Sequence, residues 1–443
     1  MKLRPSALLL GITIVGSAFG ASAPPPLPAA KPESVGLSTP RLERMGTFFQ
    51  GEVEKKTGAG YVLMVARNGK LAYAKAIGER DREHHLPMTL DTRFRIMSMT
   101  KPVTAVAVLM LYEEGRFQLD DSVANFLPEF ANPRVFTGVD AEGRVTTEAA
   151  KRPISIRHLL THTAGLGYAP GYDLKSPVGK LYGAAKIVPT RPLAENIREL
   201  AGLPLYTQPG EAWRYSYADD VLGRLVEVVS GMPYDRFLQA RLLGPLGMTH
   251  TGFYVPVADA GLLATTYKHD PSGDLVPSAY FSTALTDPVV PSPGGGAGLI
   301  STAGDYLRFA QMLANGGSFE GRQYLSPVTV ALMTSNQVPE DAMFKYWGDD
   351  SKGLGYGLSI SIIIDAASSP QADCVGDFYW GGLLNTRWIA SPRTGLVAVL
   401  FNQLDRSGDK GPLRTDQDFH NLLFASIETL NTASGASPCM ASR

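Results

Sequence analysis

The feature that most constrains the fold is the placement of strand-like segments at both ends of the chain, with helical segments between them. Residues 61–78 are largely apolar and centre on Asn68-Gly69, a pair typical of a two-residue hairpin turn. Residues 378–403 repeat this arrangement around a turn at 391–395 that contains Pro and Gly. We therefore expect one antiparallel sheet of an α/β fold, built from N-terminal and C-terminal segments.

The segments between these hairpins favour helices. Helices are expected at 39–56, directly after Ser98, and at 157–161, 221–230, 234–243, 303–315 and 418–430, with one further strand at 356–365. This order predicts an α/β domain formed by residues 24–119 and 291–443. The residues between them, 120–290, are expected to form a mostly helical subdomain inserted into it.

The balance of charges excludes one broad class of function. The 443 residues include 41 Lys and Arg and 42 Asp and Glu, which gives a net charge of -1. Such a chain has no electrostatic reason to bind nucleic acid or an anionic membrane. Its hydrophobic fraction of 44% fits a soluble globular protein with a sizeable core. We therefore expect a small-molecule partner, and the sequence does not indicate an oligomeric state.

The N-terminus has the pattern of a secretory signal peptide. Lys2 and Arg4 precede an apolar run at 7–19, and Ala21-Ser22-Ala23 offers an A-x-A cleavage site. The run is too short to span a bilayer, so no membrane insertion is expected after cleavage. We predict that residues 1–23 are a signal peptide and that the protein is periplasmic or secreted.

Cys374 and Cys439 are the two cysteines of the chain. In an oxidising compartment they could pair and tie the C-terminal tail to the body of the protein, or they could remain as free thiols. Neither opens a helix or has a histidine close by in sequence, so a thiol mechanism is not expected.

The segment RIMSMTKPVTAVAVLM carries a pattern suited to nucleophilic catalysis. Ser98 and Lys101 are three residues apart, which places them on one face of a helix, so the amine can reach the hydroxyl. Pro102 is tolerated only in a first helical turn and therefore places the helix start near Ser98. The amides and dipole of a helix start also suit an oxyanion. A second S-x-x-K, Ser407 to Lys410, has no apolar helix behind it.

The Ser98 segment resembles the nucleophile helix of the serine β-lactamase and penicillin-binding-protein superfamily. It is most similar to the class C-like esterases called family VIII carboxylesterases. The resemblance continues in order through ISIRHLLTHTAGL, GEAWRYSYADDVLGRLVEVVSG, LLGPLGMTHTGF, GGGAGLISTAGDYLRFAQMLANGG and WGGLLNTRWIASPRTGLVAVLFNQ. It implies a β-lactamase-like fold and an acyl-enzyme formed on Ser98.

The resemblance assigns the second catalytic element to Tyr215, in the motif Tyr215-Ser216-Tyr217. A phenol beside the Lys101 ammonium ionises more easily and can pass a proton to the leaving group. Tyr217 stands where β-lactamases and penicillin-binding proteins have an Asn that binds the substrate amide. This departure weakens the case for β-lactam recognition.

The third element, K-T-G or H-T-G in the superfamily, corresponds to Trp380-Gly381-Gly382 in this chain. The glycines are expected to let substrate lie along the strand edge. By resemblance, the Leu383 amide completes the oxyanion hole with that of Ser98. An indole offers one donor and an apolar face, so Trp380 suits an uncharged group better than a carboxylate. Literal or near copies at 56–58 and 393–395 are out of register.

Other motifs receive structural interpretations. His158 and His162 are spaced i and i+4, but Leu159 replaces the Glu of a zinc H-E-x-x-H motif, so no metal is expected. The chain has no G-x-S-x-G elbow. The glycines at 294–296 fit a flexible connection, which by family analogy borders the active site.

These observations together predict a serine carboxylesterase that needs no cofactor. Its catalytic residues are Ser98, Lys101 and Tyr215, and its substrate is a small-molecule ester. Three alternatives use the same fold: a β-lactamase or D-amino-acid peptidase, an acyltransferase, and an inactive penicillin-recognition module. Trp380 and Tyr217 argue against the first, and the intact catalytic residues argue against the last.

Overall fold

The computed structural model describes residues 26–168, 173, 175–279, 286, 292–338, 342, 345–346, 349–350, 352–369, 371, 373–406, 414–430 and 439. The predicted signal peptide and the second S-x-x-K motif, at 407–410, lie outside these described residues. In the part of the chain that is described, no helix is long and apolar enough to cross a membrane.

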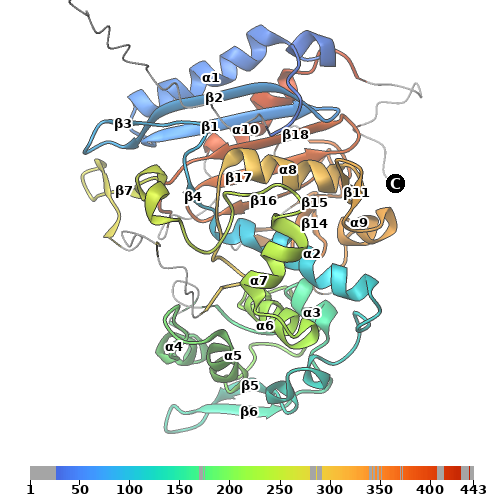
Figure 1. The fold of residues 1–443 in the computed structure, drawn as a ribbon. Coiled ribbons are helices and arrows are strands. Elements are labelled where there is room, and N and C mark those ends of the chain that lie inside the picture. The colour runs from blue at the N-terminus through green and yellow to red at the C-terminus, as the bar shows by residue number, and fades with distance from the viewer. Residues whose placement is uncertain are drawn as a thin grey trace, which may run out of the picture.

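An antiparallel sheet of eight strands joins the two ends of the chain, as predicted (Figure 1). Its order is β14-β15-β16-β17-β18-β1-β2-β3. The central pair is β1 with β18, in which Met64 lies opposite Val399. The strands are β1 (Gly60–Arg67), β2 (Lys70–Asp81), β3 (Leu86–Pro87), β14 (Leu354–Tyr356), β15 (Ser361–Ile363), β16 (Phe378–Gly382), β17 (Thr386–Ser391) and β18 (Leu396–Phe401).

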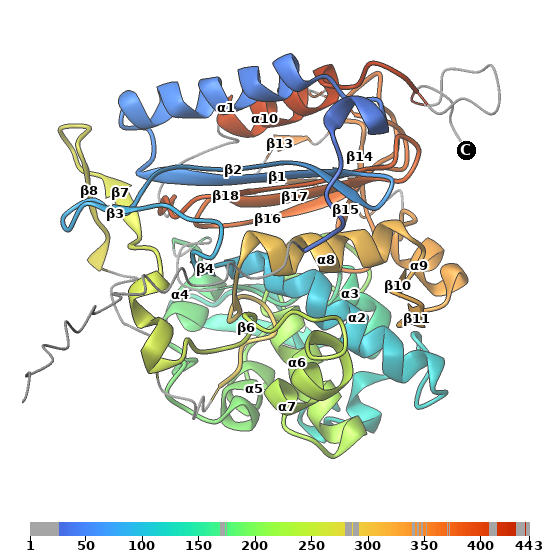
Figure 2. The same ribbon diagram turned by 45° about the horizontal axis from the view of Figure 1, so that its top comes forward.

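Both faces of the sheet are buried, which explains why its central strands are almost wholly apolar. Along β1, Val62 and Met64 point into the larger core, and Leu63 and Val65 point into a second core on the opposite face. The second core is closed by α1 (Thr39–Glu54) and α10 (Arg414–Ala425), which Figure 2 shows lying together above the sheet.

Two helices cover the other face in successive layers (Figure 2). α8 (Ala303–Ala314) packs on the sheet, and α2 (Thr100–Glu113) lies beyond it. Twelve consecutive residues of α2, Thr100 to Leu111, are buried. A helix that is buried all round must be mostly apolar all round, which is the reason for the largely apolar sequence of α2.

The remaining elements lie mostly beyond α2 or at the edges of the molecule. The helices are α3 (Ile156–Leu160), α4 (Pro177–Ala184), α5 (Leu193–Ala201), α6 (Ala218–Ser230), α7 (Tyr234–Leu238) and α9 (Pro327–Met333). The small antiparallel pairs are β4 (Phe94–Arg95) with β9 (Ile300–Ser301), β5 (Arg134–Val139) with β6 (Val145–Ala149), β7 (Tyr267–His269) with β8 (Leu275–Pro277), β10 (Ser318–Phe319) with β11 (Arg322–Gln323), and β12 (Lys345–Tyr346) with β13 (Asp349–Asp350).

Three expected elements differ from those observed. The single strand at 356–365 is instead the hairpin of β14 and β15, because Ser359 has a positive φ of 61° and its amide bonds to Leu160. The closing helix ends at Ala425 rather than at residue 430, since the Ser426 carbonyl accepts from the Ser38 amide. The helix expected at 234–243 changes to a π-helical turn at Gln239–Leu243.

The two cysteines form a disulfide, Cys374–Cys439. The sequence had left open whether they pair. The bond ties the C-terminal tail to the residues just before β16, as the paired alternative required.

Candidate active site

Ser98 lies in a sharp turn that connects β4 to α2. The turn is a 3₁₀ helix, Met97–Met99, and α2 begins at Thr100, so Pro102 falls in its first turn as predicted. Met97 has a φ of 47°, a conformation that a non-glycine residue adopts at a cost. The surrounding structure fixes this turn, and the Ile96 amide bonds to the Leu299 carbonyl at 3.0 Å. Ser98 itself is only half-buried and is accessible to a ligand.

Lys101 is fully buried and points toward Ser98. Its Nζ lies 3.3 Å from Ser98 Oγ and donates to the Gly296 carbonyl at 2.7 Å. One turn further along α2, Thr104 Oγ1 donates to the Gly295 carbonyl at 2.6 Å. The hydrogen bond to the Gly296 carbonyl therefore keeps the Lys101 amine beside the Ser98 hydroxyl.

The glycine run at 294–296 is a packed wall of the site, so the expectation of a flexible connection is wrong, although it does border the site. A Cβ on Gly295 would lie 2.1 Å from the Asp219 carbonyl oxygen. A Cβ on Gly296 would lie 2.8 Å from Asp220 Oδ2 and 3.4 Å from Lys101 Nζ. Only glycine lets this loop approach both α2 and α6 closely enough to accept the lysine's hydrogen bond.

Tyr215 reaches the same point from the loop that precedes α6. Lys101 Nζ lies 4.4 Å from the centre of its ring. The ring also contacts Trp380, with centroids 5.9 Å apart, and His162, with centroids 4.7 Å apart. The structure thus brings together Ser98, Lys101 and Tyr215, the three residues that the sequence predicts to be catalytic.

Tyr217 lines the site together with Tyr168, which the sequence analysis did not identify. The two rings stack at 4.5 Å with an interplanar angle of 25°. The Tyr168 ring centre lies 5.5 Å from Lys101 Nζ. Burial holds the pKa of Tyr168 well above its usual range, although the charge of Lys101 opposes this. Tyr168 follows THTAGL by one glycine, and that position was its only signal in the sequence.

Trp380, Gly381 and Gly382 form the end of β16, beside the Ser98 turn. Trp380 is 4% exposed and packs edge-on against Tyr356. A Cβ on Gly382 would lie 2.3 Å from the Ile96 carbonyl oxygen, two residues before Ser98. Gly382 therefore allows the strand end, and Leu383 after it, to come close to the nucleophile.

At Gly381, the missing side chain leaves room for Arg387 rather than for the Ser98 turn. A Cβ there would lie 2.4 Å from Arg387 Nη1, and that guanidinium pairs with Asp416 of α10 at 2.7 Å. Since Asp416 belongs to α10, Gly381 faces the layer of α1 and α10, away from Ser98. Asp416 thus neutralises the charge of Arg387 on the face of the sheet opposite Ser98.

Two acidic residues at the start of α6 set the electrostatics behind Lys101. Burial raises the pKa of Asp219 to about 7, and it also raises the pKa of Asp220, while Lys101 lowers both. Asp220 Oδ1 accepts from the Gly296 amide at 3.3 Å. Acidic residues in a first helical turn usually complement the helix dipole, so the sequence did not single them out.

The histidine pair does not converge on one point. His158 stays on α3, where it forms a capping box with Ser155. His162 is fully buried beside Asp219, with 3.3 Å between Nε2 and Oδ2. Among the described residues, no three His, Cys, Asp or Glu side chains gather as a metal ion would require.

The sheet with helices on both faces and the Ser-Lys-Tyr cluster at the start of α2 define a protein of the β-lactamase-like fold. The chain belongs to the Beta-lactamase family, whose sequence profile matches residues 47–421. The resemblance to the serine β-lactamase superfamily inferred from the motifs is therefore confirmed.

Three similar proteins illustrate the membership. Protein Rv1367c of Mycobacterium tuberculosis is 36% identical over 78% of this chain and 86% of its own length. Esterase EstB of Burkholderia gladioli is 32% identical over 84% of this chain and 92% of its own. The solved structure of EstCE1, a hydrolase with promiscuous acyltransferase activity, is 29% identical. It covers 88% of this chain and 98% of its own, with a TM-score of 0.71.

Proposed function

We propose that this protein is a serine carboxylesterase, similar to the family VIII esterases, that works through an acyl-enzyme on Ser98. The observation that carries the proposal is the 3.3 Å separation between Lys101 Nζ and Ser98 Oγ, with the amine held by the Gly296 carbonyl. A serine hydroxyl becomes a nucleophile when a base within hydrogen-bond reach accepts its proton.

The reaction follows from this geometry. Ser98 Oγ attacks the ester carbonyl carbon as its proton passes to Lys101, and the carbonyl oxygen gains negative charge. The amides of Ser98 and Leu383 stabilise that oxyanion. Tyr215, beside the lysine, gives its phenol proton to the alcohol oxygen as the bond between that oxygen and the carbonyl carbon breaks, and it regains the proton that Lys101 took from Ser98. Water then attacks the acyl-enzyme by the reverse proton path and releases the acid.

The surroundings favour an uncharged substrate. Asp219 and Asp220 lie behind Lys101, and the nearby Arg387 is paired with Asp416 on the other face of the sheet. Arg387 is therefore already paired and offers a substrate carboxylate no free positive charge. The apolar face of Trp380, whose ring contacts that of Tyr215, suits an uncharged acyl or alcohol group.

The relatives support an ester substrate and suggest a second activity. EstB is an esterase, and EstCE1 is a hydrolase with promiscuous acyltransferase activity. Transfer to an alcohol uses the same acyl-enzyme, since the alcohol oxygen replaces water as the attacking group. We therefore include acyl transfer as the second candidate.

The test is hydrolysis of short and medium p-nitrophenyl esters, measured beside hydrolysis of the β-lactam nitrocefin. Ester turnover that is lost in Ser98→Ala and in Lys101→Met supports the proposal. The second S-x-x-K provides matched controls, Ser407→Ala and Lys410→Met, which should retain activity. Turnover of nitrocefin alone would replace the esterase by a β-lactamase. Ester formation with added butanol would establish the transferase activity.

We also propose that the protein is exported. The proposal rests on the signal-like residues 1–23 and is supported by the disulfide Cys374–Cys439, because disulfides persist in oxidising compartments. A mature protein whose N-terminus begins at residue 24, recovered from outside the cytoplasm, would support it. A cytoplasmic protein that retains residue 1 would refute it.

A further inference from the structure

We infer that His162, backed by Asp219, is a positioning residue that holds the Tyr215 phenol against Lys101. This inference rests on the proposed function, because it gives Tyr215 a part in proton transfer. His162 does not itself touch the reacting atoms, and its sequence motif predicts only a structural role.

Tyr215 needs an anchor because it lies on no regular element. It belongs to the loop of residues 202–217 between α5 and α6, and a loop side chain keeps a catalytic position only when its surroundings fix it. A proton-transfer group that is misplaced by about 1 Å loses about two orders of magnitude in rate.

His162 forms hydrogen bonds to this loop on both sides of Tyr215. Its backbone carbonyl accepts from the Arg214 amide at 2.8 Å, and its Nδ1 lies 3.2 Å from Ser216 Oγ. Between these two contacts, the imidazole ring lies against the Tyr215 ring, with centroids 4.7 Å apart. One residue thus contacts the residue before the tyrosine, the tyrosine ring and the residue after it.

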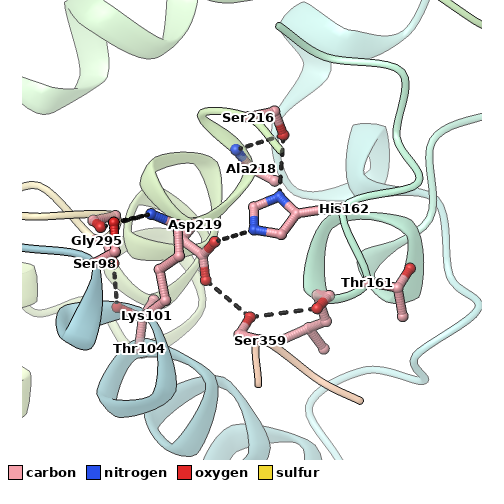
Figure 3. A network of polar contacts seen from close by, with 12 residues as sticks. Ser98, Lys101, Thr104, Thr161, His162, Ser216, Ala218, Asp219, Gly295 and Ser359 are labelled. Atoms are coloured by element: carbon pink, nitrogen blue, oxygen red, sulfur yellow. Dashed lines mark hydrogen bonds and ion pairs between the residues drawn. The ribbon is translucent and has the colours of Figure 1, made fainter. Parts of the chain in front are cut away.

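Ser216 and Asp219 lie at the two nitrogens of the imidazole. Ser216 Oγ accepts from the Ala218 amide at 3.3 Å, so its own hydrogen is free to point at His162 Nδ1. On the other side of the ring, Nε2 lies 3.3 Å from Asp219 Oδ2, without the geometry of a hydrogen bond. The other carboxylate oxygen of Asp219 accepts from Ser359 Oγ at 2.9 Å (Figure 3).

Asp219 also lies next to the segment that holds Lys101. In Figure 3, Asp219 lies between His162 on one side and Lys101 with Ser98 on the other. The Gly295 loop, whose neighbour Gly296 holds Lys101, packs directly on the Asp219 backbone.

Packing alone does not explain these residues. His162 and Asp219 are both 0% exposed, and burying an ionisable pair is costly, whereas apolar residues of the same size would fill the space without that cost. His162 also has a φ of 54°, a strained conformation for a residue with a side chain. Buried polar pairs and strain are expected where geometry serves function.

A double-mutant cycle on kcat tests the inference. His162→Phe keeps a ring against Tyr215 and removes both nitrogens, and it should lower kcat about 10- to 100-fold with little change in KM. Tyr215→Phe should lower kcat by at least as much. In the Tyr215→Phe background, His162→Phe should cost less than about threefold, because the group it positions is already absent.

Asp219→Asn serves as a second variant if His162→Phe does not fold. It keeps the shape of the side chain and should show the same non-additivity with Tyr215→Phe. The matched control is His158→Phe, on α3 shortly before His162, which removes a cap and should lower the melting temperature without any coupling to Tyr215. Circular dichroism and melting temperature establish folding for every variant.

The outcomes separate the two proposals. Full additivity of His162→Phe and Tyr215→Phe, or an unchanged kcat in folded His162→Phe and Asp219→Asn, would overturn the positioning role and leave the esterase intact. An unchanged kcat in Tyr215→Phe would overturn the proposed proton path together with this inference.

Discussion

Replacing Gly382 by alanine tests whether the end of β16 and the Ser98 turn are held in register by backbone contact. The new Cβ would lie 2.3 Å from the Ile96 carbonyl oxygen and 2.3 Å from Thr386 Oγ1. A carbon-to-oxygen contact needs about 3.3 Å, so the strand end and the turn must separate by about 1 Å. The Ile96 contact is with backbone, which cannot rotate away.

This displacement moves Leu383 relative to Ser98, and these two residues supply the proposed oxyanion hole. A misplacement of about 1 Å costs about 10²-fold in rate, or about 2.7 kcal/mol in activation free energy. Overpacking should also lower the free energy of unfolding by about 1–3 kcal/mol. We expect kcat for p-nitrophenyl butyrate to fall accordingly in protein that is folded by circular dichroism.

Gly381→Ala is the matched comparison on the same strand. Its Cβ would meet the end of the Arg387 side chain, which can move, on the face of the sheet opposite Ser98. Its kcat should fall far less than that of Gly382→Ala. Equal kcat values for the two variants, or a kcat of Gly382→Ala close to wild type, would refute the argument from register.

Three further predictions concern stability. Arg67 is fully buried and donates to four backbone carbonyls. Arg67→Met should therefore lower the free energy of unfolding by at least about 3 kcal/mol. Arg67→Lys should not restore this stability, because an ammonium cannot span the four acceptors. Burial raises the pKa of Asp377 to about 7 from 3.8, so the native carboxyl keeps a proton that the unfolded chain releases, and stability should fall as pH rises from about 4 to 7. Urea unfolding between pH 5 and 8 should show a flatter dependence in Asp377→Asn, and an unchanged slope would contradict the assignment. Reducing the disulfide Cys374–Cys439, which spans 65 residues, should lower the free energy of unfolding by about 2–4 kcal/mol and leave kcat nearly unchanged, and a large loss of kcat would show that the tail supports the site.

The predictions from local pattern succeeded where local pattern decides the structure. Asn68-Gly69 forms the hairpin turn between β1 and β2, with positive φ at both residues, because that turn type requires such residues. Pro102 falls in the first turn of α2, where its missing amide costs nothing. A strand that is buried on both faces of the sheet must be apolar along its whole length, and the sequences of β1 and β18 show this directly.

The errors arose where distant segments decide the outcome. The strand expected at 356–365 is broken because the Ser359 amide donates a hydrogen bond to the carbonyl of Leu160, which is distant in sequence. The closing helix stops where Ser426 meets Ser38. The local pattern cannot reveal either partner. Every residue carries a backbone carbonyl, so the residue types do not show which carbonyl or amide a distant segment will bond.

The sequence by itself determined the sheet formed from the two ends of the chain, the family, and the spacing that lets Lys101 reach Ser98. Only the tertiary structure decided that Gly296 holds the lysine, that Tyr168 and Asp220 join the site, and that His162 lies beside Asp219. The physical reason is that spacing within one helix fixes the distance between its side chains. Contacts between α2, α6 and the glycine loop, in contrast, depend on how closely separate backbones can pack.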